Sequence, residues 1–179
     1  MTTKSYSTQG SQLFFPDETA SPAVASPIAQ MTGFTGLGGK KTKIDITTFD
    51  SSGFKEYAGG LLDAGELTFD LIWDFTNANH ALVQKLAGAA NQTLPFFYAA
   101  SDAANTVVPT ITGTEALGTV ALAPPVTTSP VKYARSGFSF NGYFSSFVVD
   151  VKIDSVIMVH AAVQQTGGIK TIVKGATPS

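Results

Sequence analysis

The most regular pattern in the chain is the alternation of apolar and polar side chains between Glu66 and Asp74. Large apolar side chains occupy the odd positions: Leu67, Phe69, Leu71 and Trp73. Successive side chains of a β-strand point to opposite faces of its sheet, so these four share one face. The other face carries Glu66, Thr68, Asp70 and Asp74. The pattern therefore predicts a half-buried β-strand.

Further strands are predicted along most of the chain, because short apolar stretches alternate with clusters of Gly, Pro, Ser and Asn. We expect the first strand to end at Pro16, since proline cannot donate a hydrogen bond to a sheet. The predicted strands are residues 11–15, 28–34, 43–49, 93–99, 107–112, 118–122 and 169–173. Residues 138–149 and 155–164 predict a hairpin that turns near Asp150–Asp154.

A single α-helix is predicted at Ala78–Ala89. Thr76 or Asn77 can cap it, because their side-chain oxygens accept hydrogen bonds from first-turn N–H groups. Its apolar stripe consists of Leu82, Val83 and Leu86. The chain is therefore predicted to be mainly β with one flanking helix, in one domain over residues 1–179. Residues 1–27 predict an N-terminal arm and first strand, and residues 176–179 predict a mobile tail.

The segment of residues 36–65 is long, rich in glycine and unusually apolar, and loops of this length commonly have a function. Residues 36–41 predict a flexible turn with a basic tip, to which Lys40, Lys41 and Lys43 contribute. The apolar side chains are Phe49, Phe54, Tyr57, Leu61 and Leu62. We expect this loop or hairpin to contact neighbouring copies of the chain. The alternative is that it folds back onto its own domain.

Low charge is the feature of the composition that bears most on function. Only 13% of the residues are charged, against about 25% in typical soluble domains. No stretch reaches the ~18 consecutive apolar residues of a membrane helix, and the first seven residues lack the apolar segment typical of a secretory signal. Covering the apolar surface with further copies of the chain would keep such a protein soluble. The net charge of −2 gives no basic field for binding nucleic acid.

Residue patterns typical of catalysis or metal binding are absent from the sequence. Cysteine is absent, which excludes disulfides and thiolate chemistry. His80 and His160 lack the spacing of metal-ligand motifs, so we expect both to be structural. Pairs formed by Glu66 with Asp63 or Asp70 resemble glycosidase dyads only in type, and a solvated acidic face explains them better. We expect no enzyme activity, no metal and no cofactor.

Two stretches resemble the major tail tube proteins of long-tailed bacteriophages and the related tail tubes of gene transfer agents. The first runs from Ile44 through Ser52-Gly53, Lys55-Glu56 and Gly60-Leu61 to Gly65-Glu66. The second is the run Phe140-Asn141-Gly142-Tyr143-Phe144-Ser145-Ser146-Phe147, followed by residues 154–163 and Gly167-Gly168. The predicted helix lies between the two stretches, as it does in that family.

This resemblance implies a small β-sandwich or barrel with one flanking helix, assembled into six-membered rings that stack as a tube. Each subunit would contribute strands to an inner β-barrel shared between subunits. The N-terminal arm and the long loop would bridge neighbours and rings. The implied partners are further copies of the chain, a tape-measure protein, a tail-tip initiator and a tail terminator, in a virion assembled in the host cytoplasm. DNA would pass through the tube without specific binding.

Within such a barrel, residues alternate between the lumen and the wall. We expect Glu66, Thr68, Asp70 and Asp74 to face the lumen, where an acidic wall would repel DNA. The alternative for these residues is a solvated outer face. Two other functions stay open at this point. One is a different phage structural β-sandwich, such as a tail terminator or head decoration protein, and the other is a carbohydrate-binding module.

Overall fold

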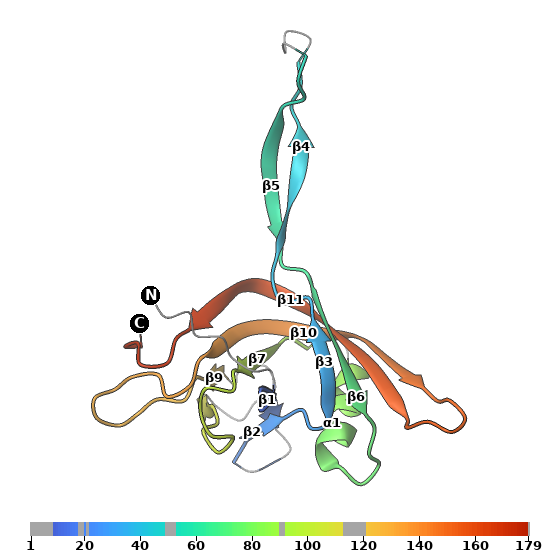
Figure 1. Cartoon of the computed structure of the whole chain (residues 1–179), viewed down its shortest axis with the longest axis vertical. Helices are drawn as coiled ribbons and strands as arrows, with labels where there is room; N and C mark the ends of the chain where they lie inside the picture. Colours follow the sequence, from blue (N-terminus) through green and yellow to red (C-terminus); the bar gives the residue numbers. More distant parts are fainter. Residues whose placement is uncertain are drawn as a thin grey trace.

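One curled antiparallel sheet of seven strands organises the molecule, in the order β2-β1-β7-β10-β11-β6-β3 (Figure 1). The computed structural model describes residues 9–17, 20, 22–48, 53–89, 92–112 and 121–178. The strands of this sheet are β1 (Gln12–Asp17), β2 (Val24–Pro27), β3 (Met31–Thr35), β6 (Glu66–Ile72), β7 (Leu94–Ala99), β10 (Gly137–Asp150) and β11 (Met158–Ile172). The sheet curls so far that Phe34 of β3 stacks on Tyr98 of β7, with ring centroids 4.8 Å apart.

Two small hairpins and one helix complete the described part of the chain. Strands β4 (Lys40–Asp45) and β5 (Tyr57–Asp63) form a hairpin that projects far from the sheet (Figure 1). Strands β8 (Thr110–Thr112) and β9 (Ala121–Ala123) form the other. Helix α1 spans Ala78–Ala87. The predicted class, mainly β with one flanking helix, is confirmed, although one curled sheet encloses the main core.

The main core lies on the inner face of the curled sheet. The odd-numbered residues Leu67, Phe69 and Leu71 of β6 are buried there, as their alternation predicts. Leu82 and Val83 of α1 close this core from the open side of the sheet. Burying one such side chain contributes about 1.5–3 kcal/mol. The alternation in sequence is therefore the direct consequence of a sheet that is covered on one face.

A second, smaller core lies on the opposite face, at the β1–β7 end of the sheet. It contains Phe14, Phe97, Ala99, Leu122, Tyr133 and Ile172. The β8–β9 hairpin and the loop before Tyr133 supply the cover on this side. Neither core includes the outer-face residues of β6, such as Glu66 and Thr68. The β1–β7 end of the sheet is thus covered on both faces, whereas the β6–β3 end is covered on one face only.

Helix α1 begins and continues largely as the sequence predicts. Asn77 is the N-cap, and its side-chain oxygen accepts from the Asn79 N–H at 3.0 Å. The helix ends at Ala87, two residues before the predicted end, because the Gly88 N–H caps the carbonyls of Gln84 and Leu86. None of the described helices is long and apolar enough to cross a membrane.

The first strand continues through Pro16, so the prediction that it ends there was wrong. Pro16 lies opposite Ala25 of β2, whereas the pairing of β1 with β7 stops at Phe14. The Ile28 N–H donates to the Leu13 carbonyl, which by the antiparallel alternation directs the Pro16 nitrogen away from β2. That side has no strand partner beyond Phe14, and a missing N–H costs nothing there.

Two other strand boundaries differ from the prediction because of single backbone positions. The predicted strand of residues 28–34 starts only at Met31, since Gln30 has a φ of 56° and turns the chain between β2 and β3. The predicted edge strand of residues 169–173 is instead the end of β11, which reaches Ile172. Gly167, with a φ of 76°, lies inside that strand as an irregularity and does not end it.

Candidate assembly surfaces

The β4–β5 hairpin is the first candidate surface, because its side chains are exposed along nearly its whole length. Phe54 is 83% exposed and Leu61 is 89% exposed, while Tyr57 and Leu62 are more than half exposed. Phe49, the remaining predicted contact residue, lies outside the described residues. A two-stranded hairpin without a core is at best marginally stable in water. The hairpin has the form expected of a segment that a partner covers.

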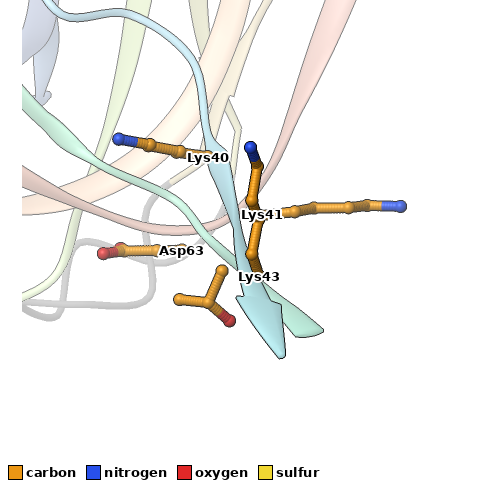
Figure 2. A pocket seen from close by; sticks show the side chains of 5 residues that line it. Lys40, Lys41, Lys43 and Asp63 are labelled. Carbon is orange, nitrogen blue, oxygen red and sulfur yellow. The ribbon is translucent and has the colours of Figure 1, made fainter. Parts of the chain in front are cut away.

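The three lysines lie at the base of this hairpin, so the prediction that they form its tip was wrong. Lys40 pairs with Asp63 and Lys41 with Leu62, next to the sheet, and the ladder continues outward to Asp45 and Tyr57. The turn therefore falls beyond Asp45, and residues 36–41 include the first part of β4. Figure 2 shows Lys40 and Asp63 extending to the same side of the hairpin.

A hollow of about 600 Å³ lies against these lysines, lined by Lys40, Lys41, Thr42, Lys43 and Asp63 (Figure 2). Within the described ranges none of the three lysines forms an ion pair. The Lys43 ammonium lies 5.6 Å from the centre of the exposed Tyr57 ring, within the range of a cation–π contact. The base of the hairpin is therefore a basic surface with little internal neutralisation.

Hydrogen bonds to β11 fix the base of the hairpin to the sheet. Gln164 donates to the Gly65 carbonyl at 2.9 Å, and Gln165 donates to the Gly36 carbonyl at 3.0 Å. Gly65 has a φ of 77°, and a Cβ there would lie 2.7 Å from the Gly38 carbonyl oxygen. Only glycine fits at this point, where the segments around Gly65 and Gly38 cross. The projecting hairpin thus leaves the sheet in a defined direction.

The outer face of β6 is the second candidate surface, and three of its four predicted residues lie there. Each bonds to a neighbouring strand: Glu66 accepts from Ser145 of β10, and Thr68 shares a 2.9 Å hydroxyl contact with Thr35 of β3. Asp70 lies 2.6 Å from the Nδ1 of His160 on β11. The face is therefore a connected polar surface across β10, β11, β6 and β3.

His160 extends this network toward the end of the sheet. Its Nε2 lies 3.9 Å from Asp150, which pairs with Lys152 at 2.7 Å. The hydrogen bond from Lys152 lowers the pKa of Asp150. Sequence reasoning did not connect His160 with Asp70. The alternation of residues 155–164 gave no clear signal, because His160 shares its strand face with Val156, Met158 and Ala162.

Asp74, the fourth predicted residue of this face, lies beyond β6 in the turn that leads to α1. Its carboxylate accepts from the Thr76 N–H at 2.8 Å and from the Thr76 hydroxyl at 2.7 Å. These bonds lower the pKa of Asp74, the side-chain bond more than the backbone bond. The chain leaves the sheet after Ile72, so the alternation of β6 no longer determines the orientation of Asp74.

Besides the outer edge of β2 at the far end of the sheet, two strand edges near the polar outer face lack a strand partner in the described structure. The edge strand β3 pairs only with β6. A hollow of about 550 Å³ lies along residues 31–34 of β3, with residues 9–11 and Tyr98 lining it as well. Strand β10 pairs with β7 over residues 137–142 only, so on that side residues 143–150 have no strand next to them. The sheet between these two edges consists of β10, β11, β6 and β3.

The His, Asp and Glu side chains of the described residues form no cluster of the metal-binding type. No group of three His, Cys, Asp or Glu side chains suited to a metal ion occurs in the described ranges. His80 is fully buried, and its Nδ1 accepts from the Asp74 N–H at 3.0 Å. The Nε2 therefore carries the proton toward the Ala29 carbonyl, also at 3.0 Å. His80 is structural, as expected.

A family comparison decides what kind of protein has these surfaces. The family model described as phage tail tube, TTP, lambda-like matches residues 4–175, nearly the whole chain. The chain belongs to the lambda-like phage tail tube family. It is a structural subunit of a phage tail tube and is located in the tail of the virion. The match decides against the head decoration, tail terminator and carbohydrate-binding alternatives.

Solved structures with the same fold come from related assemblies. The SPP1 tail tube has a TM-score of 0.58 at 8% identity, over 97% of this chain and 81% of that one. The tail of an empty gene transfer agent particle has a TM-score of 0.55 at 9% identity, over 94% and 100%. A chain of the native gene transfer agent virion gives 0.54 at 10% identity, over 90% and 95%. Among curated protein sequences, none is significantly similar.

Self-assembly into a tube is the family property that bears on both candidate surfaces. A tail tube subunit assembles with copies of itself into a tube, and both surfaces are exposed in the isolated chain. The members of this family are structural proteins of phage tails. The predicted resemblance to phage tail tube proteins is therefore confirmed. The roles of the individual surface residues stay predictions.

Proposed function

We propose that six copies of this tail tube protein close into a ring whose inner wall is one continuous β-barrel. Strands β10, β11, β6 and β3 of each copy form its share of this wall. The observation that carries the proposal is the pair of open edges at β3 and at residues 143–150 of β10. Exposed strand edges attract further strands, and closing a ring of copies removes both edges at once.

The directions of the strands support this pairing. Neighbours in the order β10-β11-β6-β3 are all antiparallel, so β10 and β3 run in opposite directions. A rotated second copy therefore presents its β10 antiparallel to the first copy's β3. The alternation continues around the ring without a parallel step, and backbone groups of both edges gain partners where the two strands overlap.

The polar outer face lines the bore in this arrangement. Glu66, Thr68 and Asp70 alternate with core residues along β6, as barrel residues alternate between lumen and wall. DNA carries one charge per ~1.7 Å of duplex, so carboxylates repeated in every ring repel it and keep it from sticking during passage. Asp74 is committed to the turn before α1, and we assign the lumen role to the three residues of β6.

The β4–β5 hairpin joins this subunit to neighbouring copies in the tube. Phe54, Tyr57, Leu61 and Leu62 supply apolar contact area, and Lys40, Lys41 and Lys43 supply charge at the base. Exposed ion pairs contribute only about 0–1 kcal/mol each, so the lysines set the register of the contact more than its strength. The protein has no catalytic role, and its other partners are a tape-measure protein, a tail-tip initiator and a tail terminator.

A paired set of variants tests this function. Phe54→Asp with Leu61→Asp introduces two carboxylates into the apolar part of the hairpin, and we expect a folded monomer that forms no tubes by negative-stain electron microscopy. Ala81→Asp with Gln84→Asp introduces two carboxylates on the exposed side of α1, and this control should form normal tubes. Normal tubes from the hairpin variant would refute the proposed contact.

A further inference from the structure

An apolar surface without an assigned role surrounds the turn between β10 and β11. Ile153 at this turn is 94% exposed, and Val151 and Val156 beside it are also exposed. Phe75, 79% exposed, lies on the adjoining chain segment, because the Trp73 N–H donates to the Ile157 carbonyl at 2.8 Å. We call Phe75, Val151, Ile153 and Val156 the turn patch. Four large apolar side chains this exposed mark an interaction surface.

The turn patch and the β4–β5 hairpin lie at opposite ends of strand β6. The hairpin leaves the sheet where β6 begins, since Asp63 at the end of β5 is followed closely by Glu66. The turn patch lies where β6 ends, since Ile72 pairs with Met158, the first residue of β11. Figure 1 shows the hairpin and the β10–β11 turn projecting from different sides of the sheet.

The charges at the two ends are opposite. The base of the hairpin carries Lys40, Lys41 and Lys43 with Asp63, and Glu66 follows at the start of β6, which leaves this end basic. The chain around the turn patch carries the acids Asp74, Asp150 and Asp154 and one lysine, Lys152. A basic apolar surface at one end and an acidic apolar surface at the other are complementary when copies are stacked end to end.

Stacking of this kind is heterologous, with two different surfaces in contact at every step, and such contacts repeat without closing. The lysines lie at the base of the hairpin and not at its far end, so the base is the part whose charge complements the acidic turn patch. Leu61 and Leu62 are the apolar residues of that base, and Leu61 is nearly as exposed as Ile153.

We propose that the turn patch of one copy receives the base of the β4–β5 hairpin of a copy in the next ring, with Ile153 packed against Leu61 and Leu62. This assignment rests on the proposed function, since it needs stacked rings. The proposed function leaves open which surface of a neighbouring copy the hairpin contacts, and this inference assigns that surface to the turn patch. Covering both surfaces removes from water Ile153 and Leu61, the two most exposed large apolar side chains of the described residues.

Chemical cross-linking tests the contact directly, because the natural chain contains no cysteine. Tubes of a Leu61→Cys, Ile153→Cys variant, taken from phage tails, are treated with a short bis-maleimide and run on a denaturing gel. We expect a ladder that continues past six linked chains, since contacts between rings extend along the tube. Each single-cysteine variant should give dimers at most, and the pair Leu61→Cys, Val126→Cys should give no ladder.

Intact tubes without any ladder would overturn the proposed contact, but they would not contradict the proposed function as a tube subunit. A ladder that stops at the number of chains in one ring would also overturn it, since the contact would then lie within rings. If cysteine at Ile153 prevents tube formation, Leu62→Cys with Val151→Cys takes its place, with the same outcomes. Failure of the unsubstituted chain to occur in tubes would instead count against the proposed function.

Discussion

The guanidinium of Arg135 donates to the side-chain oxygen of Gln12 at 2.9 Å, although Arg135 has no exposed surface. It also donates to the carbonyls of Gly10, Ala100 and Val107, at 2.9, 2.6 and 3.2 Å. Arg135 is the only arginine in the sequence. Burial lowers its pKa, an effect that nearby Asp102 opposes, and an arginine remains charged in proteins. This side chain thus joins the start of β1 to the loops around Ala100 and Val107.

Replacing Arg135 should destabilise the subunit strongly. Arg135→Met leaves four acceptors without their donor, and each unsatisfied buried group costs about 1–3 kcal/mol. We expect a loss of about 3 kcal/mol or more in the free energy of unfolding, measured by urea denaturation of the monomer. Arg135→Lys should lose less, because an ammonium keeps the charge but reaches fewer acceptors. Stability of Arg135→Met equal to that of the unsubstituted chain would contradict this role.

Leu71 and Leu61 provide a matched comparison of a core leucine with an interface leucine. Leu71→Ala empties a fully buried site and should cost about 2–5 kcal/mol of unfolding free energy. Leu61→Ala removes an exposed side chain and should change monomer stability by no more than about 0.5 kcal/mol, yet reduce tube formation. Urea denaturation and electron microscopy measure the two effects. Equal losses of monomer stability would show that the hairpin packs on its own domain.

Asp74 should make stability depend on pH in the acidic range. Its folded pKa is lowered from the ordinary value of 3.8 by the bonds from Thr76. A lowered folded pKa means that the stabilisation is complete above the ordinary pKa and disappears as pH falls through the folded pKa. Asp74→Asn should therefore be less stable than the unsubstituted chain above about pH 3.8, with the difference shrinking below it. A difference that stays constant with pH would contradict the assignment.

A change of charge on the proposed bore face should slow DNA passage. Glu66→Lys changes the charge by +2 in every copy, and a lysine attracts the DNA backbone. We expect assembled tails that eject DNA several-fold more slowly at low salt, with the rate recovering at high salt as screening increases. The control, Ala81→Lys with Gln84→Lys, changes the charge equally on the exposed side of α1 and should eject at the normal rate. Equal rates in both variants would place Glu66 outside the bore.

The parts of the fold that were predicted correctly share one property, which is burial on one face. Strand β6 and helix α1 each carry a core face and a solvent face, so their periods of two and 3.6 residues appear in the sequence. The β4–β5 hairpin is exposed on both faces and has no such period. Its strands could be suggested, but its turn could not be located, and the lysines were placed at the tip instead of the base.

Other features depend on contacts that no local pattern encodes. The burial of Arg135 requires acceptors from residues 10, 12, 100 and 107 to converge on one side chain. Gly167 and Gly168 resemble a strand break but lie within β11, because pairing with β10 resumes beyond them. The turn patch was also missed, although Val151 and Ile153 in a predicted turn are a local signal of an exposed apolar surface.

The most direct test of the account is a cryo-electron microscopy reconstruction of the tail that contains this protein. We expect a hollow tube in which β3 of each copy pairs with residues 143–150 of β10 in the next, and in which Glu66, Thr68 and Asp70 line the bore. A tube that carries these three side chains on its outer surface, or particles in which this chain stays a separate monomer, would contradict the account.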